Sequence, residues 1–356
     1  MTTKINLDDN AIYAKYDPDN MLARIHELPW QCEQAWQAAL KFPLPDDYAT
    51  VNKAVILGMG GSAIGGDLVR SLALTEGKIP VFVQRDYDLP AFVDEKTLVI
   101  ASSYSGNTEE TISAFKQAMQ TGARKLAITT GGKIKEMAEA HKIPVSIIDY
   151  QAQPRAALGF SFLPILAFLQ KLGFIKDKSA DVAEMLTVMK EMLQRTDEKA
   201  PLANNHAKQL AEKLYGNLTV VYGAGILSEV AHRWKTQINE NSKSWAFYEI
   251  FPELNHNATV GYPLPEEIAG KVMVVLLRAP SFNPRIQLRY RVTCELLERA
   301  KVKYEIVDSE GKTALSRMMS MVLSGDLTSY YMAILYQIDP SPVDVISYLK
   351  DQLSKA

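Results

Sequence analysis

The sequence predicts an α/β protein with two parallel-sheet modules, joined and extended by helices. Short, continuously apolar runs alternate with helical stretches, which is typical of parallel strands covered by helices on both faces. A glycine-rich turn follows the first run of each module, at Gly58 to Ser62 and at Gly223 to Gly225, and the two turns lie 165 residues apart. The length of 356 residues agrees with two domains. The repeated order of strand, glycine turn and helix therefore predicts two similar modules.

The first module follows an N-terminal helical extension, residues 1–45. Trp30, Trp36 and Leu40 have helical spacing there, and the helix ends near Pro43. In the module itself, residues 46–175, the predicted strands are the apolar runs at 54–57, 80–83, 97–101, 126–129 and 145–148. The apolar stretch at 156–169 is too short to cross a bilayer, so we expect a buried helix there.

The second half of the chain repeats this pattern after a helical linker. Residues 176–215 are rich in Glu, Lys, Met, Leu and Ala and carry no strand signal. In the second module, residues 216–312, the predicted strands are the runs at 219–222, 272–277 and 304–307. Residues 313–356 predict C-terminal helices with a break at 339–342.

Composition and charge restrict the class of protein. Hydrophobic residues make up 47% and charged residues 22%, which excludes a disordered or fibrous chain. The net charge of −2 argues against a broad basic surface, so we expect no nucleic-acid partner, and no segment predicts a membrane partner. Cys32 and Cys294 could form one disulfide by count. Because they lie far apart and the N-terminus lacks a signal-peptide pattern, we expect reduced thiols in a cytoplasmic protein.

The glycine turn of the first module allows two interpretations. Gly58, Gly60 and Ala63 fit the G-x-G-x-x-A pattern of a dinucleotide-binding turn. A tight turn from strand to helix would need the same small residues without any nucleotide. The second strand of a dinucleotide fold ends in an acid for the ribose, whereas here Asp86 comes late, after Gln84. A nicotinamide-dependent oxidoreductase therefore stays an alternative.

A second turn carries three hydroxyls between a strand and a helix, at Ser103, Ser105 and Thr108. The amide N–H groups and the positive dipole end of the following helix favour an anion such as phosphate. Helix capping is the alternative, because Asn107 at the N-cap with Glu110 three residues later would form a capping box that needs no ligand. Capping leaves the flanking hydroxyls without a role.

Six motifs run in order from about residue 50 to the C-terminus. They are Gly58-Met-Gly-Gly-Ser62, Ser103-Tyr-Ser-Gly-Asn-Thr108, Gln153-Pro-Arg-Ala-Ala157, Asn239-Glu-Asn241, Pro252-Glu-Leu-Asn-His-Asn257 and Asp339-Pro-Ser-Pro-Val-Asp-Val-Ile-Ser-Tyr-Leu-Lys350. Together they resemble the bifunctional phosphoglucose/phosphomannose isomerases of the sugar isomerase (SIS) domain superfamily. The resemblance implies two SIS-type, flavodoxin-like modules. It also implies reversible isomerisation of glucose 6-phosphate, and of mannose 6-phosphate, to fructose 6-phosphate by ring opening and a cis-enediol proton transfer.

The resemblance implies roles for individual residues. Glu240 matches the base that moves a proton between C2 and C1, and Arg155 matches the arginine that stabilises charge on the enediolate. His256 matches the ring-opening histidine, which in relatives comes from the neighbouring subunit of a dimer, and Lys350 matches a lysine near the end of the last helix. Taken singly, each of these residues also fits a surface side chain. The residues implied in binding the phosphate or sugar hydroxyls are Gly61, Ser62, Ser103, Ser105 and Thr108.

The implied partners are a phosphorylated hexose and a second copy of the chain. We expect no cofactor and no metal, because the sequence has no His/Asp/Glu cluster at metal-ligand spacing. At Val343 the sequence departs from relatives whose threonine is linked to acceptance of the mannose epimer. A non-catalytic phosphosugar sensor is a further alternative, although no DNA-binding segment accompanies the modules.

Overall fold

The computed structural model describes residues 5–355, which form two compact units. The first-sheet unit comprises His26–Lys190 and Glu310–Met319. The second-sheet unit comprises Glu191–Ser309, the segment up to Ile25 and the segment from Ser320 onward. Both units are therefore built from segments that are discontinuous in sequence. The domain boundaries expected from the sequence stay a prediction.

Five parallel strands form the first sheet, in the order β2-β1-β3-β4-β5. Their bounds are β1 (Lys53–Leu57), β2 (Val81–Gln84), β3 (Thr97–Ser102), β4 (Arg124–Thr129) and β5 (Val145–Ile147). All five coincide with apolar runs that predicted strands. β1 and β3 are neighbours although β2 lies between them in sequence, so their carboxyl ends form the switch point where α/β sheets bind ligands.

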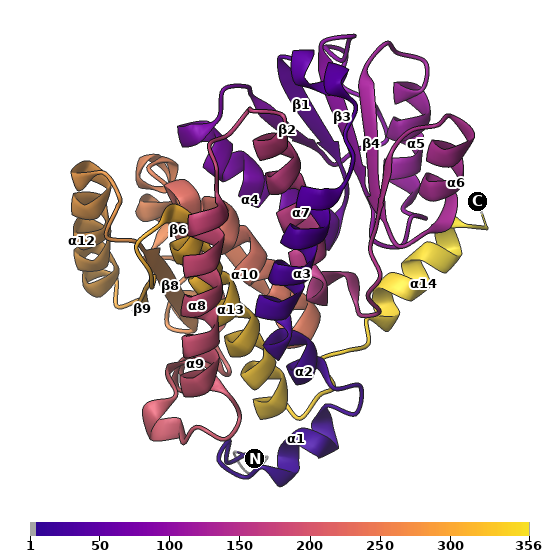
Figure 1. Ribbon diagram of the computed structural model, residues 1–356. Helices are drawn as coiled ribbons and strands as arrows, with labels where there is room; N and C mark the ends of the chain where they lie inside the picture. Colours follow the sequence, from indigo (N-terminus) through magenta and orange to yellow (C-terminus); the bar gives the residue numbers. More distant parts are fainter. Residues whose placement is uncertain (1–4, 356) are drawn as a thin grey trace. The chain divides into compact units, whose positions relative to one another are not determined.

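Helices cover both faces of the first sheet (Figure 1). Those on one face are α3 (Leu28–Lys41), α4 (Gly60–Glu76) and α7 (Leu158–Lys171), and those on the other are α5 (Glu109–Ala118) and α6 (Gly132–Ala140). Successive residues of a strand point to opposite faces of the sheet. Val55 and Val99 pack with Phe115 of α5, whereas Ile56 packs against α4. The apolar stretch of α7 is buried from Leu158 to Leu169, which confirms the predicted buried helix.

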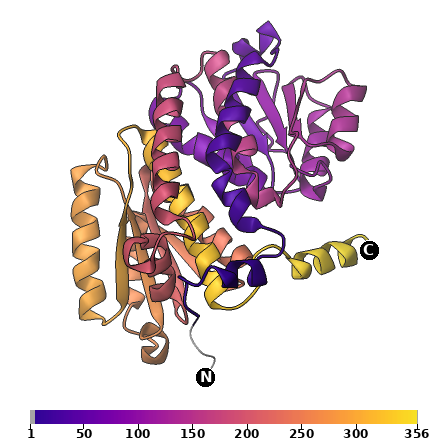
Figure 2. The same cartoon turned by 60° about the horizontal axis from the view of Figure 1, so that its bottom comes forward.

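Four parallel strands form the second sheet, in the order β7-β6-β8-β9. Their bounds are β6 (Leu218–Ala224), β7 (Ala246–Phe251), β8 (Val272–Arg278) and β9 (Lys303–Asp308). Gly223 approaches α10 (Ser228–Asn241), whereas Tyr222 packs with Tyr290 of α12 (Pro284–Arg299), so these helices cover opposite faces. Figure 2 shows α12 along its face of the sheet. The sequence analysis missed β7, an edge strand.

Short elements complete the units. The remaining helices are α1 (Ala11–Tyr16), α2 (Met21–His26), α8 (Ser179–Thr196), α9 (His206–Leu214), α11 (Glu266–Ala269), α13 (Ala314–Leu335) and α14 (Asp344–Leu353). The 3-10 turns are η1 (Asp46–Thr50), η2 (Pro154–Ala156), η3 (Leu202–Asn204), η4 (Gly225–Leu227), η5 (Glu253–His256) and η6 (Ala258–Gly261). The helices α13 and α14 confirm the predicted C-terminal helices and their break.

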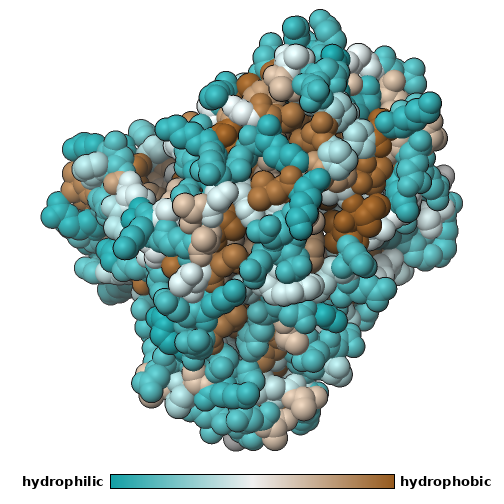
Figure 3. All heavy atoms as spheres, viewed as in Figure 1, coloured by the Kyte–Doolittle hydropathy of each residue, from teal (hydrophilic) through white to brown (hydrophobic). Residues whose placement is uncertain are grey.

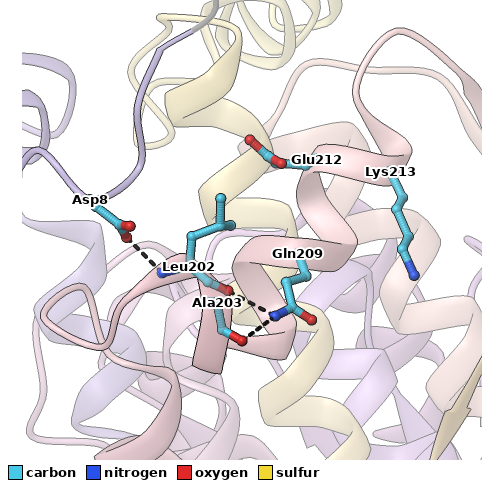
Figure 4. Close-up of a pocket in the computed structure, with 6 residues that line it drawn as sticks. All are labelled: Asp8, Leu202, Ala203, Gln209, Glu212 and Lys213. Carbon is cyan, nitrogen blue, oxygen red and sulfur yellow. Dashed lines mark hydrogen bonds between the residues drawn. The ribbon is translucent and has the colours of Figure 1, made fainter.

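The N-terminal segment of the second-sheet unit is held by polar contacts. The fully buried Lys208 donates to the carbonyl of Leu7 at 2.8 Å and contacts Asp8, and Asp8 accepts from the amide of Leu202 at 2.7 Å. A shallow pocket lies beside these contacts (Figure 4). Its Gln209 amide donates to the carbonyls of Leu202 and Ala203, so the polar groups drawn there largely serve the fold.

Polar side chains dominate the visible surface, and both cysteines are free. Figure 3 shows mostly hydrophilic residues on the visible face, with smaller hydrophobic patches among them. Within residues 5–355, none of the helices has both the length and the apolar character needed to cross a membrane. Cys32 and Cys294 are buried and form no disulfide, which confirms the expected free thiols.

Candidate active site

The local structure requires a glycine at each of the glycine positions of the turn between β1 and α4. Gly60 adopts a φ of +49°, a conformation that favours glycine. A Cβ at Gly58 would lie 2.9 Å from the carbonyl oxygen of Ser102, and one at Gly61 would lie 2.8 Å from that of Pro154. These close approaches agree with a tight turn that needs no nucleotide. Asp86 lies beyond the end of β2 and is exposed, so it gives the dinucleotide alternative no support.

The hydroxyl turn lies beside the glycine turn, at the carboxyl end of β3. Ser103 is buried, and its Oγ lies 3.0 Å from Oγ1 of Thr108. The amide of Tyr104 donates to Oγ of Ser62 at 3.1 Å, which joins the two turns. The exposed Ser105 accepts from the amide of Asn107 at 3.2 Å. The structure thus brings together all four hydroxyls expected to bind substrate.

The alternative of a capping box at Asn107 is not what the structure shows. The residue at the N-cap of α5 is Thr108, and no side chain caps this helix by a hydrogen bond. Oδ1 of Asn107 instead accepts from the amide of Lys133 in α6 at 3.1 Å. This contact between distant segments draws the asparagine away from the helix end. Capping therefore accounts for none of the hydroxyls in the turn.

Arg155 lies on η2, next to the glycine turn. Its side chain is only 3% exposed. A Cβ at Gly61 would lie 3.2 Å from Cα of Arg155, so the missing side chain of Gly61 allows η2 to pack on the start of α4. The buried Gln31 fixes the other end of η2, because its Nε2 donates to the carbonyl of Ala156 at 2.8 Å. The first-sheet unit thus places an arginine beside the glycine turn.

Glu240 lies in the last turn of α10, in the second-sheet unit, and is partly buried. Both asparagines that flank it hold the helix end. Nδ2 of Asn241 donates to Oγ of Ser329 in α13 at 3.0 Å, and Nδ2 of Asn239 donates to the carbonyl of Ser244 at 2.8 Å. The Asn-Glu-Asn motif therefore consists of one candidate base between two anchoring amides.

The rest of α10 is anchored on α13 by two further contacts. Nε1 of Trp234 donates to the carbonyl of Met321 at 2.7 Å, and Arg233 forms a buried ion pair with Asp326 at 2.6 Å. After the helix, Nζ of Lys243 donates to the carbonyl of Pro340 at 3.0 Å. These contacts fix the helix that carries Glu240 within its unit.

His256 ends η5, directly after β7, and its side chain is exposed. The preceding residue, Asn255, is tied to α12: Nδ2 donates to Oγ1 of the buried Thr293 at 2.9 Å, and Oδ1 accepts from Nη1 of Arg289 at 3.1 Å. The following residue, Asn257, donates to Oε1 of Glu253 at 2.8 Å. Each neighbour of His256 is thus held by its side-chain amide.

Lys350 lies on α14, where it is exposed. Several apolar side chains of this helix are exposed as well, among them Val345 at 82% and Tyr348 at 67%. Val343 is the N-cap residue and provides no side-chain hydrogen bond to the helix. Val343 therefore lies at the start of the helix that carries Lys350.

Sequence reasoning missed two residues that organise the site. Tyr104 stands between the two motif serines Ser103 and Ser105. Only the serine and threonine hydroxyls of this turn were considered as phosphate ligands, so the phenol of Tyr104 received no role. Asn255 stands next to His256 in a loop whose supporting strand, β7, was not predicted. An aromatic residue within a turn of small polar residues was the one available signal, at Tyr104.

Comparisons with known proteins cover nearly the whole chain. A family model described as the bacterial phospho-glucose isomerase C-terminal SIS domain matches residues 203–353, and the SIS domain model matches residues 47–162. A bifunctional phosphoglucose/phosphomannose isomerase from Caldicellulosiruptor bescii is 44% identical over 336 residues, which are 94% of this chain and 99% of that protein. The chain belongs to the bifunctional phosphoglucose/phosphomannose isomerase family. A second relative, from Aquifex aeolicus, is 38% identical over 85% of this chain and 90% of its own length.

Solved structures agree with the fold of this isomerase family. A glucose-6-phosphate isomerase like protein from Thermus thermophilus matches with a TM-score of 0.64 and 18% identity, over 98% of this chain and 99% of that chain. The C-terminal domain of glucosamine-fructose-6-phosphate aminotransferase from Francisella tularensis has a TM-score of 0.73 and 14% identity, over 90% and 98%. The predicted α/β fold with two SIS domains is confirmed, and family membership makes the protein an enzyme.

Proposed function

We propose that this enzyme interconverts glucose 6-phosphate and fructose 6-phosphate, and mannose 6-phosphate and fructose 6-phosphate. The observation that carries the proposal is the 44% identity over 94% of the chain to a bifunctional phosphoglucose/phosphomannose isomerase. The geometry supports it in three ways. The hydroxyls of the turn lie close together, and Arg155 is buried. The helix end that carries Glu240 is anchored by the hydrogen bond of Asn241. Both reactions share one product and differ only in the configuration at C2.

The hydroxyl turn is the proposed binding site of the phosphate. Ser62, Ser103, Ser105 and Thr108 surround the start of α5, where the helix dipole favours a negative charge. Fixing the phosphate anchors the far end of the sugar. The reacting carbons C1 and C2 are then held within a restricted volume, which lowers the entropic cost of the proton transfer.

Proton transfer is the proposed role of Glu240. Its carboxylate takes the proton from C2 of the open-chain aldose while the electron pair moves to O1, which gives the cis-enediolate. The hydroxyl proton passes from O2 to O1. Glu240 then returns its proton to C1 as O2 becomes the ketone carbonyl, which completes the ketose without any external oxidant. Arg155 stabilises the negative charge that develops on the enediolate oxygens.

Ring opening precedes this transfer and is proposed for His256 with Lys350. It requires an acid at the ring oxygen and a base at the C1 hydroxyl, and the two residues together supply these groups. An imidazole exchanges protons near neutral pH, which suits it to this step. The exposed position of His256 on η5 leaves its ring accessible to a substrate.

A homodimer in which His256 is shared between subunits is also part of the proposal. Exposed apolar side chains lie on β7 and on the segment after η5, namely Phe247 at 48%, Val260 at 81%, Leu264 at 72% and Ile268 at 51%. Three of them border an apolar pocket of about 350 Å³ in the second-sheet unit. Exposed apolar side chains of this extent favour burial against a second copy. The free thiols support a cytoplasmic location.

A coupled assay tests the proposed reaction. Purified protein is given glucose 6-phosphate or mannose 6-phosphate, with and without a chelator, and fructose 6-phosphate is measured. We expect conversion of glucose 6-phosphate that the chelator does not change. Binding of hexose phosphates without turnover of either would contradict the enzyme and favour a phosphosugar sensor.

A mixing experiment tests the shared site. Chains carrying Glu240→Gln are combined with chains carrying His256→Ala, each of which is expected to be nearly inactive alone. If a site combines residues of two subunits, heterodimers contain one intact site and recover part of the activity. No recovery in a mixture shown to contain heterodimers would exclude the shared site.

A further inference from the structure

Tyr104 makes polar contacts in several directions from the hydroxyl turn. Its backbone amide donates to Oγ of Ser62 at 3.1 Å. Its carbonyl oxygen accepts from the amide of Thr130 at 3.0 Å and from Oγ1 of the same residue at 2.8 Å. The backbone at Tyr104 is therefore fixed both to the start of α4 and to the end of β4.

The phenol hydroxyl of Tyr104 reaches a third segment. It donates to the carbonyl of Tyr150 at 2.5 Å and accepts from the amide of Ala152 at 2.9 Å. A phenol can act as donor and acceptor together, and both capacities are used here. Tyr150 and Ala152 lie between β5 and η2, and Ala152 is three residues before Arg155.

The segment that carries Arg155 is thus fixed on both sides. Before Arg155 it is bound by the Tyr104 hydroxyl, and after Arg155 it is bound by Gln31, whose Nε2 donates to the carbonyl of Ala156. Gln31 belongs to α3, which is far from the hydroxyl turn in sequence. The Tyr104 hydroxyl therefore links the hydroxyl turn directly to the segment that leads to Arg155.

We propose that Tyr104 is a positioning residue that holds Arg155 at a fixed place relative to the phosphate-binding turn. The proposal rests on the proposed isomerase function. A guanidinium stabilises an enediolate only where its place is fixed before the charge develops, because reorientation during the reaction would consume the gain. A small displacement of a charged group lowers the rate, while the four hydroxyls still bind the phosphate.

Substitution Tyr104→Phe tests this role, since it keeps the ring and the backbone contacts and removes only the two hydroxyl contacts. We expect kcat to fall by about tenfold and KM to change by less than about threefold. Tyr48→Phe is the matched control, because the Tyr48 hydroxyl also donates to a backbone carbonyl, that of Lys125 at 2.5 Å, outside the site. Equal losses of kcat in the two variants would overturn the proposal.

A double-mutant cycle separates positioning from general stability. Tyr104→Phe is measured in the wild-type chain and in a chain that carries Arg155→Met. If the hydroxyl acts through Arg155, it has no further effect on kcat once the guanidinium is absent. The same tenfold loss in both backgrounds would show that Tyr104 acts independently of Arg155 and would overturn the proposal.

Hydrogen exchange provides a measurement that does not depend on turnover. The amide of Ala152 should exchange faster in Tyr104→Phe than in wild type and should be unchanged in Tyr48→Phe. Unchanged exchange in Tyr104→Phe would overturn the proposed tether. A wild-type protein that converts no hexose phosphate contradicts the proposed function, whereas an active wild type with undiminished kcat in Tyr104→Phe contradicts only the role of Tyr104.

Discussion

The candidate site residues of the first-sheet unit and those of the second-sheet unit are held in different ways. In the first-sheet unit, Ser62, Ser103 and Arg155 are themselves buried and contact neighbouring turns. In the second-sheet unit, Glu240 is partly buried and His256 is exposed, and the residues beside them provide the anchoring. Ser62, Ser103 and Arg155 are thus fixed by their own burial, whereas Glu240 and His256, the proposed proton-transfer groups, are fixed through their neighbours in sequence.

This difference agrees with what the two groups have to do. A phosphate site gains from rigid, dehydrated donors, because an anion bound there does not change charge during the reaction. A general base must accept and release a proton and contact two adjacent carbon atoms. Anchoring the residues on either side leaves such a side chain accessible while its backbone stays in place. The predictions below test each part of this comparison.

The largest effect is expected from Glu240→Gln. An amide cannot accept the C2 proton, so kcat should fall by about a thousandfold with little change in KM. Exchange of the substrate C2 proton with deuterated water, followed by NMR, should be lost in parallel. Glu295→Gln, at an exposed position on α12, is the control and should behave as wild type. Near-normal turnover by Glu240→Gln would make the assignment of the base wrong.

The second effect concerns the packing of η2. Gly61→Ala places a Cβ 2.8 Å from the carbonyl oxygen of Pro154, so η2 must shift away from α4. We expect a loss of about 1–3 kcal/mol in the free energy of unfolding and a fall in kcat of about tenfold to a hundredfold. Thermal unfolding and kinetics measure the two.

Gly131→Ala serves as the control for Gly61→Ala. Gly131 has extended backbone with a φ of 164°, and no atom lies within 4 Å of the place that a Cβ would take there. This variant should keep both stability and kcat. If Gly61→Ala were as active as Gly131→Ala, the fixed packing of Arg155 against the glycine turn would have no catalytic importance.

A smaller effect is expected at the loop that carries His256. Asn255→Ala removes the contacts with Thr293 and Arg289. We expect a fivefold to tenfold fall in kcat, which corresponds to about the net free energy of one hydrogen bond. The loss should disappear in a His256→Ala background. Asn283→Ala, which removes the N-cap of α12, should lower stability by about 1 kcal/mol without changing kcat. An equal fall in kcat for both asparagine variants would count against positioning.

The smallest effect is expected at the start of α14. Val343→Thr supplies a hydroxyl at the N-cap, which should stabilise this helix by about 0.5–1 kcal/mol and slow the exchange of its first amides. We also expect a higher ratio of mannose 6-phosphate to glucose 6-phosphate turnover, as the family resemblance implies. Val345→Thr, within the helix, is the control. An unchanged ratio of mannose 6-phosphate to glucose 6-phosphate turnover would show that residue 343 does not determine the epimer preference.

Local sequence pattern predicted central and edge strands alike, wherever a short apolar run stood between turns or helices. β1 and β3, at the centre of the first sheet, are almost wholly buried, because helices cover both faces there. The edge strands β2 and β5 are only partly buried, and their apolar runs still predicted them. β7 was not predicted because Glu249 interrupts its apolar residues, of which Phe247, Tyr248 and Ile250 are exposed. This strand therefore has neither a continuous apolar run nor a clean alternation of apolar and polar residues.

Contacts between distant segments limited the prediction of the site. Asn107 has the local pattern of a helix cap, but Lys133 is its partner, and nothing near Asn107 in sequence indicates this. The same holds for Tyr104 and Asn255, whose partners lie in other elements. Motif residues were identifiable from the resemblance, whereas the residues that hold them became identifiable only with the structure.

The order of segments along the chain has a consequence for synthesis. The first-sheet unit has its complete sheet by residue 150, and only a short segment, Glu310–Met319, is added late. The helix that carries Glu240 is different, since Trp234, Arg233 and Asn241 contact Met321, Asp326 and Ser329. On the ribosome, where domains fold in the order of emergence, the hydroxyl turn can form early. The helix that carries Glu240 can reach its final packing only after residues 321–329 have been synthesised.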